Sequence, residues 1–232
     1  SGGITPSLVY YIDMFSTLGF QRLILNSLII GLGSTIIAVL VGLLAGYGLT
    51  FQAGPSARRY DFMMLMMRSV PPFLLVIPLL ITLSSWRLWD THLGMVIAYL
   101  TLNAPIAYLI IRSLMSEMPR ELVEAAMLMG CSTLTVIRRV VVPILLPGIV
   151  VTVMFMLVVT WNEFLLASLL TGPDARTVSV GVWAGVGEQI GTFRTVEFEA
   201  QAAAGTVALV PAALLIFLIR RRIVRMFTFT SA

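Results

Sequence analysis

The residues best suited to a functional role lie in a polar segment between two long hydrophobic runs. The segment reads PRELVEAAMLMGCSTLTVIRRVVVP and extends from Pro119 to Pro143. Pro119 suits the first turn of a helix, where its missing N–H costs nothing. An apolar stripe with helical spacing follows: Leu122, Ala125, Ala126 and Met129. The other face carries Arg120, Glu121 and Glu124. These residues fit a short recognition helix of about 15 Å, the size of a partner's groove.

The second half of this segment contains signals for a turn. Gly130 stands where the helix would end, because glycine accepts the left-handed conformation of a C-terminal cap. Ser132 is a candidate N-cap for a second helix that leads to Arg138 and Arg139. The alternative is an amphipathic helix that lies on lipid headgroups. The small apolar stripe has no Trp or Phe anchor, and its polar face is acidic as well as basic, so we favour a protein partner.

Few residues of this chain could carry out catalysis or bind a metal. Cys131 is its only cysteine and His92 its only histidine. An intrachain disulfide, a cysteine metal site, a histidine cluster and an ordinary Ser–His–Asp triad are therefore excluded. A Gly-rich phosphate loop ending in Lys-Ser/Thr is also missing, since the chain has no lysine. We expect no enzyme activity, no metal and no cofactor in this chain.

Composition places the recognition segment on a membrane protein. Of the 232 residues, 59% are hydrophobic and only 11% are charged, whereas ordinary soluble domains are about a quarter charged. The basic residues cluster at the ends of apolar runs, which indicates membrane topology and not a nucleic-acid surface. The chain is therefore predicted to be an all-α membrane protein.

Five apolar runs are long enough to cross a bilayer. They cover residues 23–49, 62–84, 93–111, 140–170 and 200–219 of a membrane domain at 23–225. The remaining parts are an aromatic segment at 1–22, the loop at 113–139, a glycine-bearing loop at 171–199 and a tail at 226–232. Prolines interrupt the second run at Pro71, Pro72 and Pro78, and Pro147 is expected to kink the fourth.

Arginine counting predicts the orientation. With five alternating spans, one side collects Arg58, Arg59, Arg112, Arg120, Arg138, Arg139 and the C-terminal cluster, whereas the other collects Arg22, Arg87, Arg176 and Arg194. The richer side is cytoplasmic by the positive-inside rule. The loop at 113–139 and the C-terminus are therefore predicted inside, and residues 1–22 and 171–199 outside.

The polar segment resembles the EAA motif of binding-protein-dependent ABC importer permeases. That motif reads E-A-A, three residues, G, nine residues and I-x-L-P. Here Glu124-Ala125-Ala126, Gly130 and Pro143 match it in register, with Val140 and Val142 in place of Ile and Leu. The resemblance covers the chain from Asn26 to the last span and is strongest to carbohydrate-type permeases of the maltose and trehalose kind.

The resemblance implies a type I ABC importer permease fold with a cytoplasmic EAA coupling helix. Five spans are visible of an expected six, so we expect the leading helix to be absent. Glu124 would contact an ATPase subunit, Ala125 and Ala126 would permit close docking, and Gly130 would allow the sharp turn. The implied partners are two ATPase subunits that bind ATP and Mg²⁺, a homologous second permease and an extracytoplasmic solute-binding protein. The implied location is the bacterial inner membrane.

Two further groups could meet the solute. Trp161-Asn162-Glu163-Phe164 resembles the W-N-[D/E]-F pattern of sugar permeases, and an acid beside a membrane span is a functional candidate. The alternative is that Trp161 anchors at the interface and Glu163 is solvated or caps a neighbouring element. Asn103 could bind a hydroxylated solute, but we prefer a role in satisfying helix backbone opened by Pro105.

The resemblance also implies a loop that enters the binding protein. Its counterpart here is Gly185, Val186, Gly187, Glu188, Gln189 and Gly191. A plain interfacial segment is the alternative. The C-terminus departs from the family pattern, since the chain ends in MFTFTSA where sugar permeases often have a Gly-Ala-Val-Lys-Gly-like tail.

The solute stays open among sugars, polyols and glycerol phosphodiesters. An ion-coupled secondary transporter is the rival function, but it would need mid-membrane acids and often internal repeats. Glu163 is the sole acid in a predicted span interior and lies near one end. We therefore expect half of an ATP-driven importer that works by alternating access.

Overall fold

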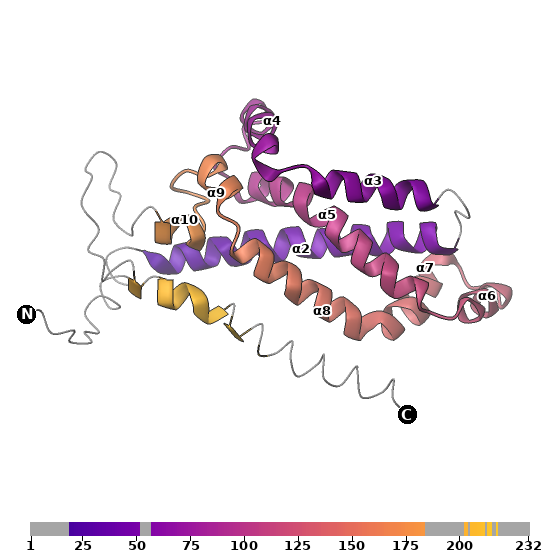
Figure 1. The fold of residues 1–232 in the computed structure, drawn as a ribbon. Coiled ribbons are helices and arrows are strands. Elements are labelled where there is room, and N and C mark those ends of the chain that lie inside the picture. The colour runs from indigo at the N-terminus through magenta and orange to yellow at the C-terminus, as the bar shows by residue number, and fades with distance from the viewer. Residues whose placement is uncertain are drawn as a thin grey trace, which may run out of the picture.

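A computed structural model describes residues 19–51 and 57–183, together with residues 202–203, 205–211, 213–214 and 217. The elements in these residues are helical, as Figure 1 shows. In chain order, the helices of residues 19–183 are α2 (Phe20–Phe51), α3 (Ala57–Ser69), α4 (Pro72–Ser85), α5 (His92–Ser116), α6 (Arg120–Leu128), α7 (Thr133–Val136), a π-helical turn (Ile137–Val141), α8 (Val142–Trp161), α9 (Leu165–Leu170) and α10 (Val178–Trp183).

Within the described residues, three helical stretches are long and apolar enough to cross a membrane. They are Phe20–Phe51, His92–Ser116 and Thr133–Trp161. α2 has 32 residues and so a length of about 48 Å, which exceeds the roughly 30 Å of a hydrocarbon core. Its ends therefore extend beyond that core or the helix tilts. Part of the predicted fifth span, the segment 1–18 and the tail lie outside the described residues.

The second predicted span is not one continuous helix. Residues 57–85 form α3 and α4, which meet at an angle of 89°. Pro71 and Pro72 lie at the bend, with Pro71 as N-cap and Pro72 as the first residue of α4. Two consecutive prolines remove two backbone donors and clash with the preceding turn, so the helix ends there and restarts in a new direction. Figure 1 shows α4 standing across the long helices.

The fourth predicted span also ends earlier than expected. α8 stops at Trp161, and a separate short helix, α9, begins at Leu165. Residues 162–164 separate the two helices, and the Glu163 carboxylate accepts bonds from the backbone N–H groups of Leu166 and Ala167 in the first turn of α9. At the other end, a π-helical turn precedes Pro143, and the N–H of Val142 bonds to the carbonyl of Ile137. This i→i−5 bond places the wider turn next to proline, whose N–H is missing.

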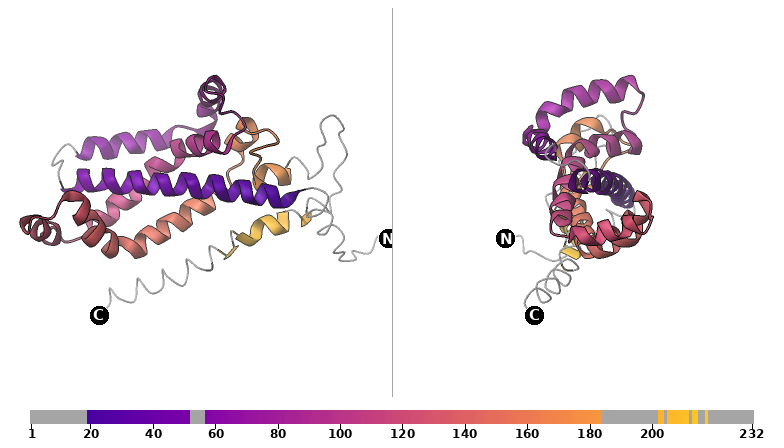
Figure 2. Two further views of the ribbon diagram at one scale, coloured as in Figure 1. Left: turned by 180° about the vertical axis from the view of Figure 1, so that it is seen from behind. Right: turned by 90° about the vertical axis from the view of Figure 1, so that its right-hand side faces the viewer.

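α2 and α5 pack closely against each other. A Cβ on Gly42 would lie 3.0 Å from the carbonyl carbon of Ala107, and one on Gly46 would lie 3.3 Å from the sulfur of Met115. These two glycines, one turn apart, let the α5 backbone approach α2, as small residues do in membrane helix pairs. Figure 2 shows the long helices clustered around this pair.

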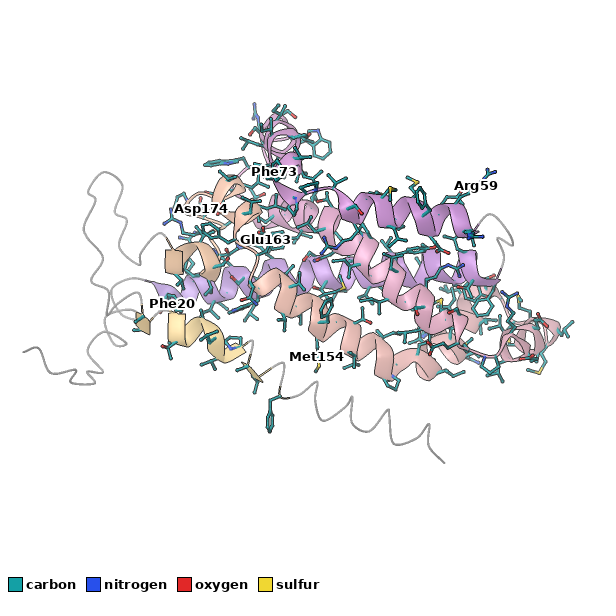
Figure 3. All side chains as sticks on the ribbon, viewed as in Figure 1. Phe20, Arg59, Phe73, Met154, Glu163 and Asp174 are labelled. Carbon is teal, nitrogen blue, oxygen red and sulfur yellow. The ribbon has the colours of Figure 1, made fainter. Side chains whose placement is uncertain are left out.

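Different short helices lie at the two ends of the bundle. α6 and α7 lie together at one end of the long helices, and α4, α9 and α10 lie at the other (Figures 1 and 2). Figure 3 labels Arg59 toward the first end and Glu163 and Asp174 toward the second. We call these the α6 end and the α9 end.

Candidate functional site

The helix α6 is a short element whose inner face packs on the core. Val123 is fully buried and Ala126 is 5% exposed, and both belong to an apolar cluster with Met118, Val136 and Ile137. The helix begins at Arg120, one residue after the predicted start, with Pro119 as its N-cap. α6 is thereby fixed to α5 and to the second helical segment.

The predicted apolar stripe is divided between two faces. Ala126 faces the core, whereas Leu122 and Ala125 are exposed and Met129 is 79% exposed. The reason is that Val123 and Ala126, three residues apart, supply the contact with the core and set the rotation of the helix. The expectation that Ala126 helps a partner dock closely therefore does not fit this structure.

The predicted turn at the end of α6 is confirmed in detail. Gly130 has φ +82°, the left-handed region. The N–H of Gly130 bonds to the carbonyl of Met127 at 2.9 Å, and that of Cys131 bonds to the carbonyl of Ala126 at 3.2 Å. This pair of bonds is the Schellman motif, which needs a residue that tolerates positive φ. Ser132 then caps α7, as its side chain accepts a bond from the N–H of Thr135.

The outer side of this turn exposes apolar side chains beside an acid. Leu128 is 89% exposed, and Leu134 on α7 is 69% exposed. Glu124 is also exposed, and no ion pair is formed by it within the described residues. Water-exposed protein surfaces rarely present such large apolar groups together, and exposed apolar patches commonly mark contact surfaces. We call Leu122, Glu124, Leu128, Met129 and Leu134 the outer patch.

A polar network lies behind α6 where three helices end. The Arg112 guanidinium on α5 bonds to Asp61 on α3, with Nε to Oδ1 at 2.8 Å and Nη2 to Oδ2 at 3.3 Å. Its Nη1 donates to the hydroxyl of Thr50 on α2 at 2.6 Å. Tyr108, one turn earlier on α5, also donates to Asp61. Arg120, the first residue of α6, reaches the carbonyl oxygen of Thr50 at 3.4 Å. We call Thr50, Asp61, Tyr108, Arg112 and Arg120 the α5 network.

A second network joins the elements of the α9 end. The Asp90 carboxylate accepts bonds from the backbone N–H groups of Gly172 at 2.7 Å, Asp174 at 3.1 Å and Ala175 at 2.9 Å. Asn26 on α2 donates to the carbonyls of Asp174 and Arg176, both at 2.9 Å. His92 Nε2 lies 2.8 Å from the side-chain oxygen of Asn26. This oxygen can only accept, so Nε2 is the donor. The loop after α9 is thus fastened to α2 and to the α4–α5 turn.

Trp161 and Glu163 are both engaged in the fold. The Trp161 indole donates to the carbonyl of Ala208 at 2.9 Å, and its side chain is 8% exposed. The Glu163 carboxylate accepts from the N–H groups of Leu166 at 2.9 Å and Ala167 at 3.2 Å. These contacts agree with the anchoring and capping alternative. Asn162 is exposed and donates to the carbonyl of Val158 in its own helix.

The other predicted site residues lie apart from one another. Asn103 is 1% exposed and donates to the hydroxyl of Ser34 on α2 at 3.3 Å, so it joins two helices. Pro143 lies in the first turn of α8 and not on α6. The predicted binding-protein loop, Gly185, Val186, Gly187, Glu188, Gln189 and Gly191, falls outside the described residues.

Sequence reasoning missed both polar networks. A signal for the first existed: Asp61 directly precedes the second predicted span and Arg112 directly follows the third, so both lie on the same membrane side of neighbouring spans. Opposite charges at such positions can pair. The three backbone N–H groups that bond to Asp90 gave no signal, because they depend on the path of a loop more than 80 residues later in the chain.

Comparison with protein families identifies one family over most of the sequence. Residues 38–228 match the family described as the binding-protein-dependent transport system inner membrane component. The sulfoquinovosyl glycerol transport system permease protein SmoH of Agrobacterium fabrum is 29% identical over 220 residues, which are 94% of this chain and 75% of SmoH. The trehalose transport system permease protein SugB of Mycobacterium tuberculosis is 29% identical over 227 residues, which are 96% of this chain and 82% of SugB.

A solved structure agrees with the fold. A chain from the inward-facing MetNI methionine ABC transporter superposes with a TM-score of 0.66 at 18% identity. The alignment covers 90% of this chain and 94% of the transporter chain. At this identity the match establishes the fold of the described helices and no more.

Proposed function

This chain belongs to the family of binding-protein-dependent transport system inner membrane components and is a permease subunit of an ABC importer; on that premise we propose that α6 is its coupling helix and that the outer patch receives an ATPase subunit. The chain forms half of a translocation pathway, and a homologous permease supplies the other half. ATP and Mg²⁺ bind to the partner ATPase subunits. A solute-binding protein outside the cytoplasmic membrane delivers the solute.

The observation that carries this proposal is the outer patch. Glu124 is exposed on a helix that is fixed from behind by Val123 and Ala126. A docking helix needs both properties: a free outer face for recognition and an inner face that transmits force to the bundle. Large exposed side chains such as Leu128 and Met129 supply the apolar area that a protein interface buries.

The position of α6 also supports a cytoplasmic site. Arg58, Arg59, Arg138 and Arg139 belong to helices that begin near the α6 end. The positive-inside rule then places this end in the cytoplasm, where an ATPase can reach it. Closure of two ATPase subunits on ATP would draw the docked helices together and rock the long helices between two orientations.

The proposed solute is a sugar or a related polyhydroxylated compound. The support is the set of relatives, since SmoH and SugB are described as permeases for a sugar derivative and a disaccharide. An ion-coupled carrier is less well supported. Glu163, the acid that such a carrier could have used, has its carboxylate bonded to the backbone of α9.

A pull-down from the native membrane tests the proposal. Wild-type chain should bring down an ATP-hydrolysing subunit and a second permease. Glu124→Arg should keep the permease and lose the ATPase, because a reversed charge is desolvated against the partner's groove. Glu117→Arg is the matched control: it makes the same charge change at an exposed position just after α5, outside the outer patch, and should retain both partners. If wild type brings down the second permease but no ATPase, the proposed coupling role of α6 is wrong.

A further inference from the structure

The α5 network connects α2, α3, α5 and α6. Arg112 lies one turn before the end of α5 at Ser116, and only residues 117–119 separate α5 from α6. Its guanidinium uses Nε and Nη2 for Asp61 and Nη1 for Thr50. Each nitrogen of this one side chain is therefore committed to a different acceptor atom on α3 or α2.

The ion pair between Arg112 and Asp61 has the bidentate geometry that makes such pairs strong. The Arg112 and Asp61 side chains are 19% and 33% exposed, so water screens them only in part. Two N–H groups of Arg112 bond to the Asp61 carboxylate, and Tyr108 adds a third bond to the same carboxylate. The bidentate contact fixes orientation as well as distance, because a planar guanidinium matches a carboxylate only edge to edge. The network therefore resists rotation of α3 relative to α5.

Close backbone packing sets the position of this network. Gly46 lets α2 approach α5, since a Cβ there would meet the Met115 sulfur at 3.3 Å and the Arg112 Cα at 3.7 Å. Thr50 follows Gly46 by one helical turn, which brings its hydroxyl to Arg112. Arg120 adds a contact from α6 itself to the carbonyl oxygen of Thr50.

We propose that Arg112 is a positioning residue for coupling: it locks α2 and α3 to the end of α5 that carries α6, so that a displacement of α6 moves the three helices as one body. This inference rests on the proposed function, because an ATPase must displace α6. Apolar contacts around Val123 and Ala126 attach α6 to the core. The bonds of Arg112 add a fixed orientation of α2 and α3 relative to the end of α5, because hydrogen bonds to a planar guanidinium are directional.

The bonds of Arg112 to α3 and to α2 can be removed together or separately; we call them the α3 arm and the α2 arm. Arg112→Gln removes both arms. Thr50→Val keeps the shape of the side chain and removes only the hydroxyl that Nη1 bonds, so it cuts the α2 arm and leaves the Asp61 pair in place. Arg59→Gln is the matched control, since Arg59 is an exposed arginine on α3 with no ion pair in the described part of the chain.

Spin-label distances in the complete native complex test the proposal. In a Cys131→Ser background, one label at Glu121 on α6 is paired with a label at Met63 on α3 or at Leu44 on α2, all exposed positions. Distances are measured without nucleotide and after trapping with ATP and vanadate. In the parent and in Arg59→Gln, both distance distributions should stay narrow with the same mean in the two states.

The variants should change this pattern selectively. Arg112→Gln should broaden both distances or shift them on trapping. Thr50→Val should do so for the α6–α2 pair only. If Arg112→Gln leaves both distances as in the parent, or if Thr50→Val loosens both pairs equally, the positioning role is wrong. A pull-down of the same labelled complexes separates the two proposals: loss of the ATPase from the parent overturns the coupling function, whereas retained ATPase with unchanged distances overturns this inference alone.

Discussion

Gly130 controls the direction in which the chain leaves the coupling helix. Its φ of +82° belongs to the region that L side chains avoid, at a cost of about 1–2 kcal/mol. Space is not the constraint, because a Cβ at this position would meet nothing within 4 Å. The glycine is therefore needed for its backbone freedom and for no packing reason.

We predict that Gly130→Ala destabilises the end of α6 by about 1 kcal/mol, because alanine must take the strained conformation or give up the Schellman bonds. Amide hydrogen exchange of residues 126–132 should become faster than in wild type. Gly130→Asn should destabilise the end of α6 less than Gly130→Ala, since asparagine tolerates the left-handed region better. Equal exchange in the two variants would show that backbone strain at this residue is not what limits the turn.

Glu163 is the residue for which two roles can be separated by substitution. Its carboxylate accepts two backbone N–H groups at the start of α9. Removal of a side-chain cap costs about 0.5–2 kcal/mol. We predict that Glu163→Ala speeds amide exchange in α9 and lowers the thermal midpoint of the purified chain, whereas Glu163→Gln, which keeps a carbonyl acceptor, has a smaller effect. A Gln variant as damaged as the Ala variant would mean that the charge itself matters.

At the scale of elements, the α2–α5 pair is the part of the fold with least room for change. A Cβ on Gly42 would lie 3.0 Å from the carbonyl carbon of Ala107 and 3.1 Å from the backbone nitrogen of Tyr108. Backbone atoms cannot rotate aside as a flexible side chain would. Gly48, on the same helix, has nothing within 4 Å of its would-be Cβ. The two positions therefore form a matched pair.

We predict that Gly42→Ala lowers the free energy of unfolding in detergent by about 1–3 kcal/mol, because the added methyl overpacks the interface. Gly48→Ala should be neutral or should stabilise α2 by up to about 1 kcal/mol, since alanine is the better helix former. Thermal unfolding of the two variants beside wild type provides the measurement. Equal losses would indicate that helix propensity, and not close packing, dominates.

The elements that sequence predicted well are those set by local rules. Gly130 and Ser132 mark a turn and a cap through their own backbone and side-chain chemistry, and both predictions are confirmed. The apolar runs at 23–49 and 93–111 predicted the long helices α2 and α5, because about 20 consecutive apolar residues are what a helix needs to cross a bilayer. Consecutive prolines at 71 and 72 marked an interruption, but the 89° between α3 and α4 depends on what each half packs against.

Contacts between distant residues were beyond sequence reasoning. Arg112 lies 51 residues from Asp61 and 62 from Thr50, and a single sequence does not say which side chains meet over such separations. The prediction of which face of α6 is buried was wrong for a related reason. Its pattern allowed more than one apolar face, and the choice of Val123 and Ala126 as the inner face is made by the core beneath them.

At the scale of the whole molecule, the described residues combine an apolar exterior with polar networks at the two ends of the long helices. Large side chains along α2 and α4 are exposed in the single chain, among them Leu44 at 57% and Ile77 at 68%. Lipid or partner helices cover such surfaces in a membrane. The polar networks lie instead where the helices end: the α5 network at the α6 end, and the bonds of Asp90 and Asn26 at the α9 end. Among the described residues, the long helices connect these two ends.

This division makes the orientation of the molecule directly testable. Cys131 is the only cysteine of the chain, is partly exposed and follows the turn at the α6 end. We predict that a membrane-impermeant maleimide leaves it unlabelled in intact cells and labels it once the membrane is opened and the chain is in detergent. In a Cys131→Ser background, Ser85→Cys should show the opposite behaviour, because Ser85 is exposed at the end of α4, on the α9 side. Labelling of Cys131 in intact cells, with protection of the residue-85 thiol, would place α6 outside. A cytoplasmic ATPase could not then reach the outer patch, so the proposed coupling would fail whatever the partner.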